Sequence, residues 1–244
     1  AEHWQQHAAA TGAGLSGTGD VDPDEVHEHL AAVLSDWSAS PCETDLAGTP
    51  PRGYAHIEDS SEQVQIVVVH DAPLETSHDC WRFRLATQVL AGGMASRLFT
   101  EVREKRGLCY TVSASYRNDP RRGWRSCYVG TSPDRAQESL DVLASELDRL
   151  GTPEGAITRE EFDRARAGLR SRIVFSGESM LARAHALVND AERLGRPRSL
   201  AEHIAEVDAL TLDDVNHALR VLPASRATVQ TLGPHAMTVP ESLG

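Results

Sequence analysis

Hydrophobic residues recur along the chain with two different periods, and these periods predict its helices and strands. Three- or four-residue spacing predicts helices with one buried face over 81–91, 132–150, 158–173, 179–194 and 211–219. Short apolar runs between turn residues predict strands over 52–58, 63–70, 109–116, 124–130 and 227–233. This order of elements predicts an α+β fold with a mixed, largely antiparallel sheet and helices packed mainly on one face.

The first part of the chain carries weaker signals. Residues 12–22 are predicted to form a first strand, although their glycines and serines make them a poor strand by propensity. A helix is predicted to start at Asp22-Pro23 and to end near Trp37, because an N-cap acid followed by proline is typical of a helix start. The predicted buried stripe of this helix consists of Val26, Leu30 and Val33.

Two further segments complete the prediction of elements. Residues 38–51, rich in Ser, Pro, Thr and Gly, are predicted to be a loop. The apolar run 64–70, VQIVVVH, is predicted to be a central strand buried on both faces. A capping box is predicted at Thr158 to Glu161, where a longer helix begins.

The most informative stretch is residues 90–116, where a glycine-rich turn, a short helix, a second turn and a strand follow closely. The spacing of Leu98, Phe99 and Val102 predicts an inward helix face, and Arg103, four residues after Phe99, projects along the same side. Gly107 suits the left-handed conformation that ends a helix.

The strand that follows is predicted to run from Cys109 to Tyr116 with a clean period of two. Its apolar face consists of Tyr110, Val112, Ala114 and Tyr116, and Thr111, Ser113 and Ser115 occupy the other face. The turn fixes the corner between helix and strand. We therefore expect the corner to present Arg103 and Tyr110 together.

The segment GGMASRLFTEVREKRGLCYTVSA, residues 92–114, resembles a segment in the carboxy-terminal half of the insulinase-like (M16, pitrilysin-type) zinc metallopeptidases. The resemblance implies that Arg103 and Tyr110 hold substrate and stabilise the tetrahedral intermediate. These residue types suit that role, because a guanidinium and a phenol donate hydrogen bonds to an oxyanion without competing for a metal. The alternative is that Arg103 is a solvated surface charge and Tyr110 a core residue with a wet hydroxyl.

The zinc motif of that family, His-x-x-Glu-His, does not occur among the eleven histidines of the sequence. His27 and His29 would point to nearly opposite sides of a helix, so they do not share the one face that a metal site needs. His78, Asp79 and Cys80 lie in a turn-rich segment without further ligands nearby. The resemblance therefore implies the half without zinc, and the zinc is expected in a partner half.

Composition narrows the classes of partner. The 244 residues carry a formal net charge of -12, which argues against nucleic acid and anionic membranes as partners. No apolar run approaches the length of a membrane span. An acidic surface weakly favours basic peptides. With no targeting segment, cytoplasmic is the default expectation for the compartment.

The cysteines and the arginines of the turn NDPRRG are predicted to have structural and not catalytic roles. Four scattered cysteines predict reduced thiols, although a bridge between Cys109 and Cys127 stays open because their strands are predicted to pair. Arginines in and after the turn NDPRRG are predicted to be turn and edge charges rather than a site for acidic groups. They are Arg121, Arg122 and Arg125.

The resemblance extends over residues 1–234 and predicts one M16-type carboxy-terminal domain, 1–244, with 1–11 as the tail of a helix from a missing amino-terminal half. The implied function is the non-zinc half or subunit of a zinc metalloendopeptidase. Its implied partners are a zinc-bearing M16-type domain, a peptide substrate and, for the isolated chain, a second copy. The alternative is a catalytically silent structural or peptide-binding subunit. A complete hydrolase built on Cys109 or a serine with a histidine has no supporting motif.

Overall fold

The computed structural model describes residues 10, 13–37, 52–221 and 226–244. The loop predicted for 38–51, and all but residue 10 of the helix tail predicted for 1–11, lie outside these residues. The chain divides into two units, one of residues 1–50 with 175–198 and one of residues 51–174 with 199–244.

The second unit is built on one five-stranded sheet with the strand order β1-β5-β2-β4-β3. Its first and last strands in the chain, β1 and β5, pair in parallel, and the other neighbours pair antiparallel. The mixed, largely antiparallel sheet is thus confirmed. The strand bounds are β1 Gly53–Glu58, β2 Val64–Ala72, β3 Cys109–Asn118, β4 Gly123–Thr131 and β5 Thr228–Gly233.

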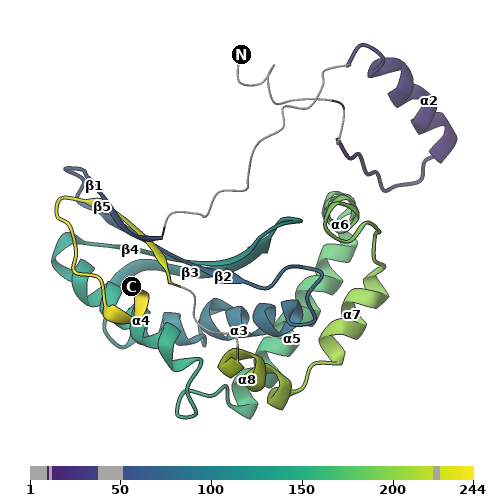
Figure 1. Cartoon of the computed structure of the whole chain (residues 1–244). Helices are drawn as coiled ribbons and strands as arrows, with labels where there is room; N and C mark the ends of the chain where they lie inside the picture. The colour runs from purple at the N-terminus through teal and green to yellow at the C-terminus, as the bar shows by residue number, and fades with distance from the viewer. Residues whose placement is uncertain (1–9, 11–12, 38–51, 222–225) are drawn as a thin grey trace. The chain divides into compact units, whose positions relative to one another are not determined.

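Helices of this unit cover one face of the sheet, as predicted (Figure 1). The helix bounds are α3 Cys80–Ala91, α4 Ala136–Arg149, α5 Arg159–Glu178, α7 Leu200–Asp208 and α8 Leu212–Val221. Short helical turns lie at Pro133–Arg135 and Glu241–Leu243. None of the helices in the described part of the chain is long and apolar enough to cross a membrane.

Strand β2 is central but is buried on one face only. Val64, Ile66 and Val68 are almost inaccessible and pack under the helices, whereas Val67 and Val69 on the other face are half-buried. The prediction of burial on both faces was therefore wrong. An apolar run shows which side chains tolerate burial, but the layer that buries them comes from elsewhere in the chain.

The capping box at the start of α5 is confirmed. The backbone N–H of Thr158 donates to the Glu161 carboxylate at 2.9 Å, and the backbone N–H of Glu161 donates to the Thr158 hydroxyl at 3.3 Å. The buried face of α5 also follows the predicted period, with Phe162, Ala165 and Leu169 in the core.

The first unit departs from two predictions. Helix α2 (Pro23–Val33) starts at the Asp22 cap, but none of its side chains is buried, and Val33 is 63% exposed. Residues 13–22 form no strand. Instead, the Ser16 hydroxyl donates to a backbone carbonyl of α6 (Met180–Leu194). The Thr18 hydroxyl donates to the carbonyl of Met180, the first residue of the same helix. The glycines here leave too few side chains to pack as a strand.

Candidate functional site

The helix of the predicted corner has π-helical geometry. The element η1 (Phe99–Glu104) has a backbone bond from Lys105 N to Thr100 O at 2.9 Å, which spans five residues instead of four. Leu108 N then donates to Val102 O at 2.9 Å, and Gly107 has a φ of +61°. Such widened turns are rare and occur often at functional sites. The sequence predicts a helix here but not its π geometry.

A partly buried ion pair holds the segment that leads into this corner. The Arg97 guanidinium binds the Glu161 carboxylate at 2.7 Å and the carbonyls of Gly155 and Ala156 at 2.7 and 3.2 Å. Burial alone would raise the pKa of Glu161, but hydrogen bonds from Arg97 and Thr158 hold it below the usual value. The Glu161 hydrogen bond raises the pKa of Arg97. One carboxylate therefore caps α5 and also fixes the segment that leads into η1.

Arg103 differs from the other basic residues of segment 97–106. Lys105 and Arg106 both pair with Glu101, at 2.6 and 2.7 Å. Arg103 is exposed and stacks over the Phe99 ring at 5.0 Å, as its spacing predicted. It makes no ion pair with any residue that the structure describes. Its guanidinium is therefore held in place by a ring, with its donors available to another group.

Tyr110 lies at an irregularity of the edge strand. Cys109 pairs with Thr131 and Thr111 pairs with Gly130, so Tyr110 is the extra residue of a β-bulge. The clean period of two predicted for this strand is therefore wrong at its first residues. A bulge changes the direction of a side chain, and Tyr110 is 65% exposed.

The structure places Arg103 and Tyr110 on the two arms of one corner. Burial raises the pKa of the Cys109 thiol at the start of β3, and the charge of Arg103 opposes that rise. Within the described residues no hydrogen bond joins Arg103 to Tyr110. The donors of each side chain are therefore not used on the other.

The structure answers one question about neighbouring residues that the sequence left open and corrects one interpretation. Cys109 and Cys127 form no bridge: Cys127 faces Ala114 across the strand pair, and both thiols are free. Arg125 is not an edge charge, because β4 lies between β2 and β3 and the Arg125 side chain is buried beneath the helices. Its burial lowers the pKa of the guanidinium.

The zinc of the resembled family does not fit the described residues of this chain, since none of their His, Cys, Asp and Glu side chains gather in groups of three or more. Arg82 occupies the cluster of His78, Asp79 and Cys80, with contacts of 2.5 Å to both His78 Nδ1 and Asp79 Oδ1.

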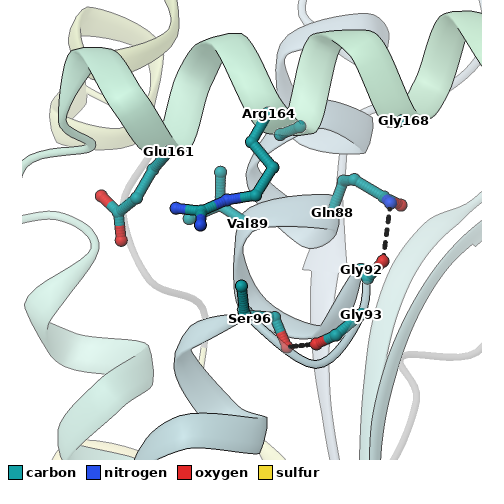
Figure 2. A pocket seen from close by; sticks show the side chains of 10 residues that line it. Gln88, Val89, Gly92, Gly93, Ser96, Glu161, Arg164 and Gly168 are labelled. Carbon is teal, nitrogen blue, oxygen red and sulfur yellow. Dashed lines mark hydrogen bonds between the residues drawn. The ribbon is translucent and has the colours of Figure 1, made fainter.

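Sequence reasoning missed two hollows beside α3. The first, of about 160 Å³, lies between α5 and the turn after α3; Figure 2 shows Glu161 and Arg164 on one side and Gly92, Gly93 and Ser96 on the other. The second, of about 330 Å³, lies between α3, α5 and β3. Both hollows are lined by segments that lie far apart in sequence, so no local sequence pattern predicts them.

Comparison with known proteins now decides the family. A family model described as "Peptidase M16 inactive domain" matches residues 1–169. The chain belongs to this family. The M16 inactive domain here is 26% identical over 240 residues to an uncharacterized zinc protease of Streptomyces coelicolor, covering 95% of this chain and 52% of that protein. The chain thus spans about half the length of this curated relative.

Solved structures agree on the fold. The crystal structure of a peptidase M16 inactive domain from Pseudomonas fluorescens matches with a TM-score of 0.68 and 23% identity, over 91% of this chain and 53% of that chain. A chain of Complex III2 from Candida albicans matches with a TM-score of 0.68 and 14% identity, over 88% of this chain and 54% of that one. At these identities the likeness establishes the fold alone.

Proposed function

We propose that this chain is the non-zinc half or subunit of an M16-like zinc metalloendopeptidase and contributes Arg103 and Tyr110 to peptide-bond hydrolysis. The observation that carries the proposal is the state of Arg103, the basic side chain of segment 97–106 that no described carboxylate neutralises, on the same corner as the bulged Tyr110. Family membership adds that relatives about twice as long are named zinc proteases.

The proposed chemistry uses only donors. The Arg103 guanidinium holds a substrate carbonyl or carboxylate, and the Tyr110 hydroxyl donates to the oxyanion that develops as the scissile carbonyl becomes tetrahedral. Zinc and its ligands come from the partner half. Residues 1–244 act as one domain in this assembly.

The second candidate function is a structural or peptide-binding subunit without chemistry. The observation in its favour is the likeness in fold to a chain of Complex III2 from Candida albicans. In such a subunit Arg103 and Tyr110 would have no role in turnover.

The deciding experiment measures metal content and cleavage of a quenched fluorescent peptide mixture. The chain is assayed alone and after mixing with an M16-type half that carries His-x-x-Glu-His. We expect the chain alone to be zinc-free and inactive, and the mixture to show activity that a chelator removes. Inactivity of a mixture in which light scattering shows that the two halves associate would favour the structural subunit.

Variants then test the two side chains. In the active mixture, Arg103→Ala or Tyr110→Phe should lower kcat on the order of a hundredfold, as loss of one oxyanion donor does. Arg106→Ala is the matched control, because that arginine is already neutralised by Glu101. Unchanged turnover in both variants would remove the site assignment.

A further inference from the structure

The hollow between α3, α5 and β3 has the features of a built binding groove. Its walls are Trp81 and Arg84 from α3, Tyr116 with its two predecessors from β3, and Arg172 with its apolar neighbours from α5. All of these residues belong to one unit of the chain. Binding sites commonly combine apolar walls with a few fixed polar groups, and this groove does so.

The groove carries a surplus of positive charge. The Arg84 guanidinium lies 4.6 Å from the centre of the Trp81 ring and 5.4 Å from that of Tyr116, and it pairs with Glu75, whose side chain is 1% exposed. Arg172 is exposed and donates to the Gln88 side chain at 3.2 Å. It pairs with no carboxylate in the described part of the chain. Two guanidinium groups thus line the groove, and of these two only that of Arg84 pairs with a described carboxylate, in a protein of net charge -12.

The third wall of the groove is an edge strand. β3 ends the strand order, so in the described sheet it pairs with β4 alone. Its outward N–H and C=O groups line up beside Ala114, Ser115 and Tyr116, which border the groove. An unpaired edge of this kind is a template for an extended peptide, which gains backbone hydrogen bonds along it.

We propose that an extended peptide segment adds to the free edge of β3 and places a carboxylate between Arg172 and Arg84. The carboxylate is either an acidic side chain or the carboxy terminus of the peptide, because both present the same fork to a guanidinium. The inference rests on the proposed function in that it names the substrate class that this half would hold. It differs in its site, since Arg103 and Tyr110 do not line the groove.

Fluorescence anisotropy with the full chain and three labelled nine-residue peptides of Ala, Ser, Thr and Val tests the proposal. The first peptide has one central Glu and blocked ends, the second has Gln in its place, and the third is the Gln peptide with a free carboxy terminus. We expect at least one carboxylate peptide to bind roughly fivefold or more tightly than the neutral one. The peptide that does so identifies the source of the carboxylate. Equal binding of all three overturns the proposal.

Variants of α5 test the position of the site. Arg172→Gln should weaken carboxylate binding roughly five- to tenfold, and Arg172→Lys should keep part of it by retaining the charge. Arg166→Gln is the control, because Arg166 lies on the same helix outside both hollows and pairs with Asp163. An equal loss in Arg172→Gln and Arg166→Gln would show a general charge effect and overturn the assignment.

N-methylated peptides test strand addition. Methyl groups on alternate backbone amides block one edge of an extended peptide, so one of the two alternate patterns should abolish binding and the other should leave it intact. Equal binding of both patterns would overturn strand addition. Self-association of the chain that excludes the peptide would assign the edge to a second copy and would also overturn the proposal.

The groove and the catalytic proposal fail separately. If the carboxylate and neutral peptides bind alike while Arg103→Ala still slows the assembled enzyme, the groove is wrong and the catalytic role stands. If the assembled halves cleave nothing while peptide binding still depends on Arg172, the catalytic role is wrong and the groove stands.

Discussion

Arg97 and Arg103 are separated by less than two helical turns, yet their surroundings are opposite. The Arg97 side chain is 9% exposed, and its guanidinium donates hydrogen bonds to Glu161 and to two backbone carbonyls. Arg103 is exposed, touches the Phe99 ring and binds no described carboxylate. An arginine at position 97 therefore joins two segments of the fold, as a brace, whereas the arginine at position 103 leaves its hydrogen-bond donors accessible.

Under the proposed function, this difference separates a residue that stabilises the corner from one that acts on substrate. A buried charge pair is strongly destabilising to break, because the remaining partner keeps its charge without compensation. An exposed, unpaired guanidinium contributes little to folding and keeps its donors for a ligand. Four changes, taken in order of expected effect on the free energy of unfolding, test this separation.

Arg97→Met should have the largest effect, lowering the free energy of unfolding by about 3 to 4 kcal/mol. It removes the partner of Glu161 and leaves two carbonyls without their donor. Urea denaturation checks the value. A loss below about 1 kcal/mol would mean that water replaces the guanidinium and that Arg97 is no brace.

His70 should make the sheet unit sensitive to acid. Burial, then the charge of Arg125, lowers the pKa of His70 from 6.5 to about 4. The unfolded chain therefore takes up a proton at higher pH than the folded one, and stability falls as pH drops from 6.5 through 4. The loss should reach about 2 to 3 kcal/mol below pH 4. Comparing His70→Gln with the parent in urea at pH 7 and 4 isolates it: the variant's smaller pH dependence is the expected result.

Gly107→Ala should cost about 1 to 2 kcal/mol, because the φ of +61° at this turn is strained for a residue with a Cβ. Thermal unfolding checks this against Gly151→Ala, which lies at a turn without positive φ. In the assembled enzyme, Gly107→Ala should also reduce kcat, since the turn connects Arg103 to Tyr110. An unchanged kcat would indicate that the corner tolerates movement.

Arg103→Ala should have the smallest effect on folding, within about 0.5 kcal/mol of the parent. Its stacking on Phe99 is exposed and adds little. Denaturation of this variant beside Arg97→Met gives the comparison directly. A loss as large as that of Arg97→Met would contradict the division between brace and donor.

Local patterns predicted the parts of the fold that depend on neighbours in sequence. The capping box of Thr158 and Glu161 and the left-handed Gly107 are such cases, because each needs only a few residues. The placement of Arg103 on the same side as Phe99 followed from helical spacing in the same way.

Features that join distant segments were beyond such patterns. The second bond of Glu161, to Arg97, and the groove shared by three elements depend on tertiary packing. The bulge at Tyr110 needs the register of a partner strand. Val26 and Val33 of α2 have the period of a buried face but are exposed, because periodicity shows what could be buried and not what covers it.

The position of β5 has a consequence for how the chain folds as it is made. This last strand lies between β1 and β2, so the sheet stays split until nearly the whole chain has been synthesised. The β3–β4 hairpin joins neighbours in sequence and can form early, whereas β1 must wait for a partner from the far end. Ribosome-bound chains that end before residue 228 should therefore expose the β1 and β2 edges to chaperones.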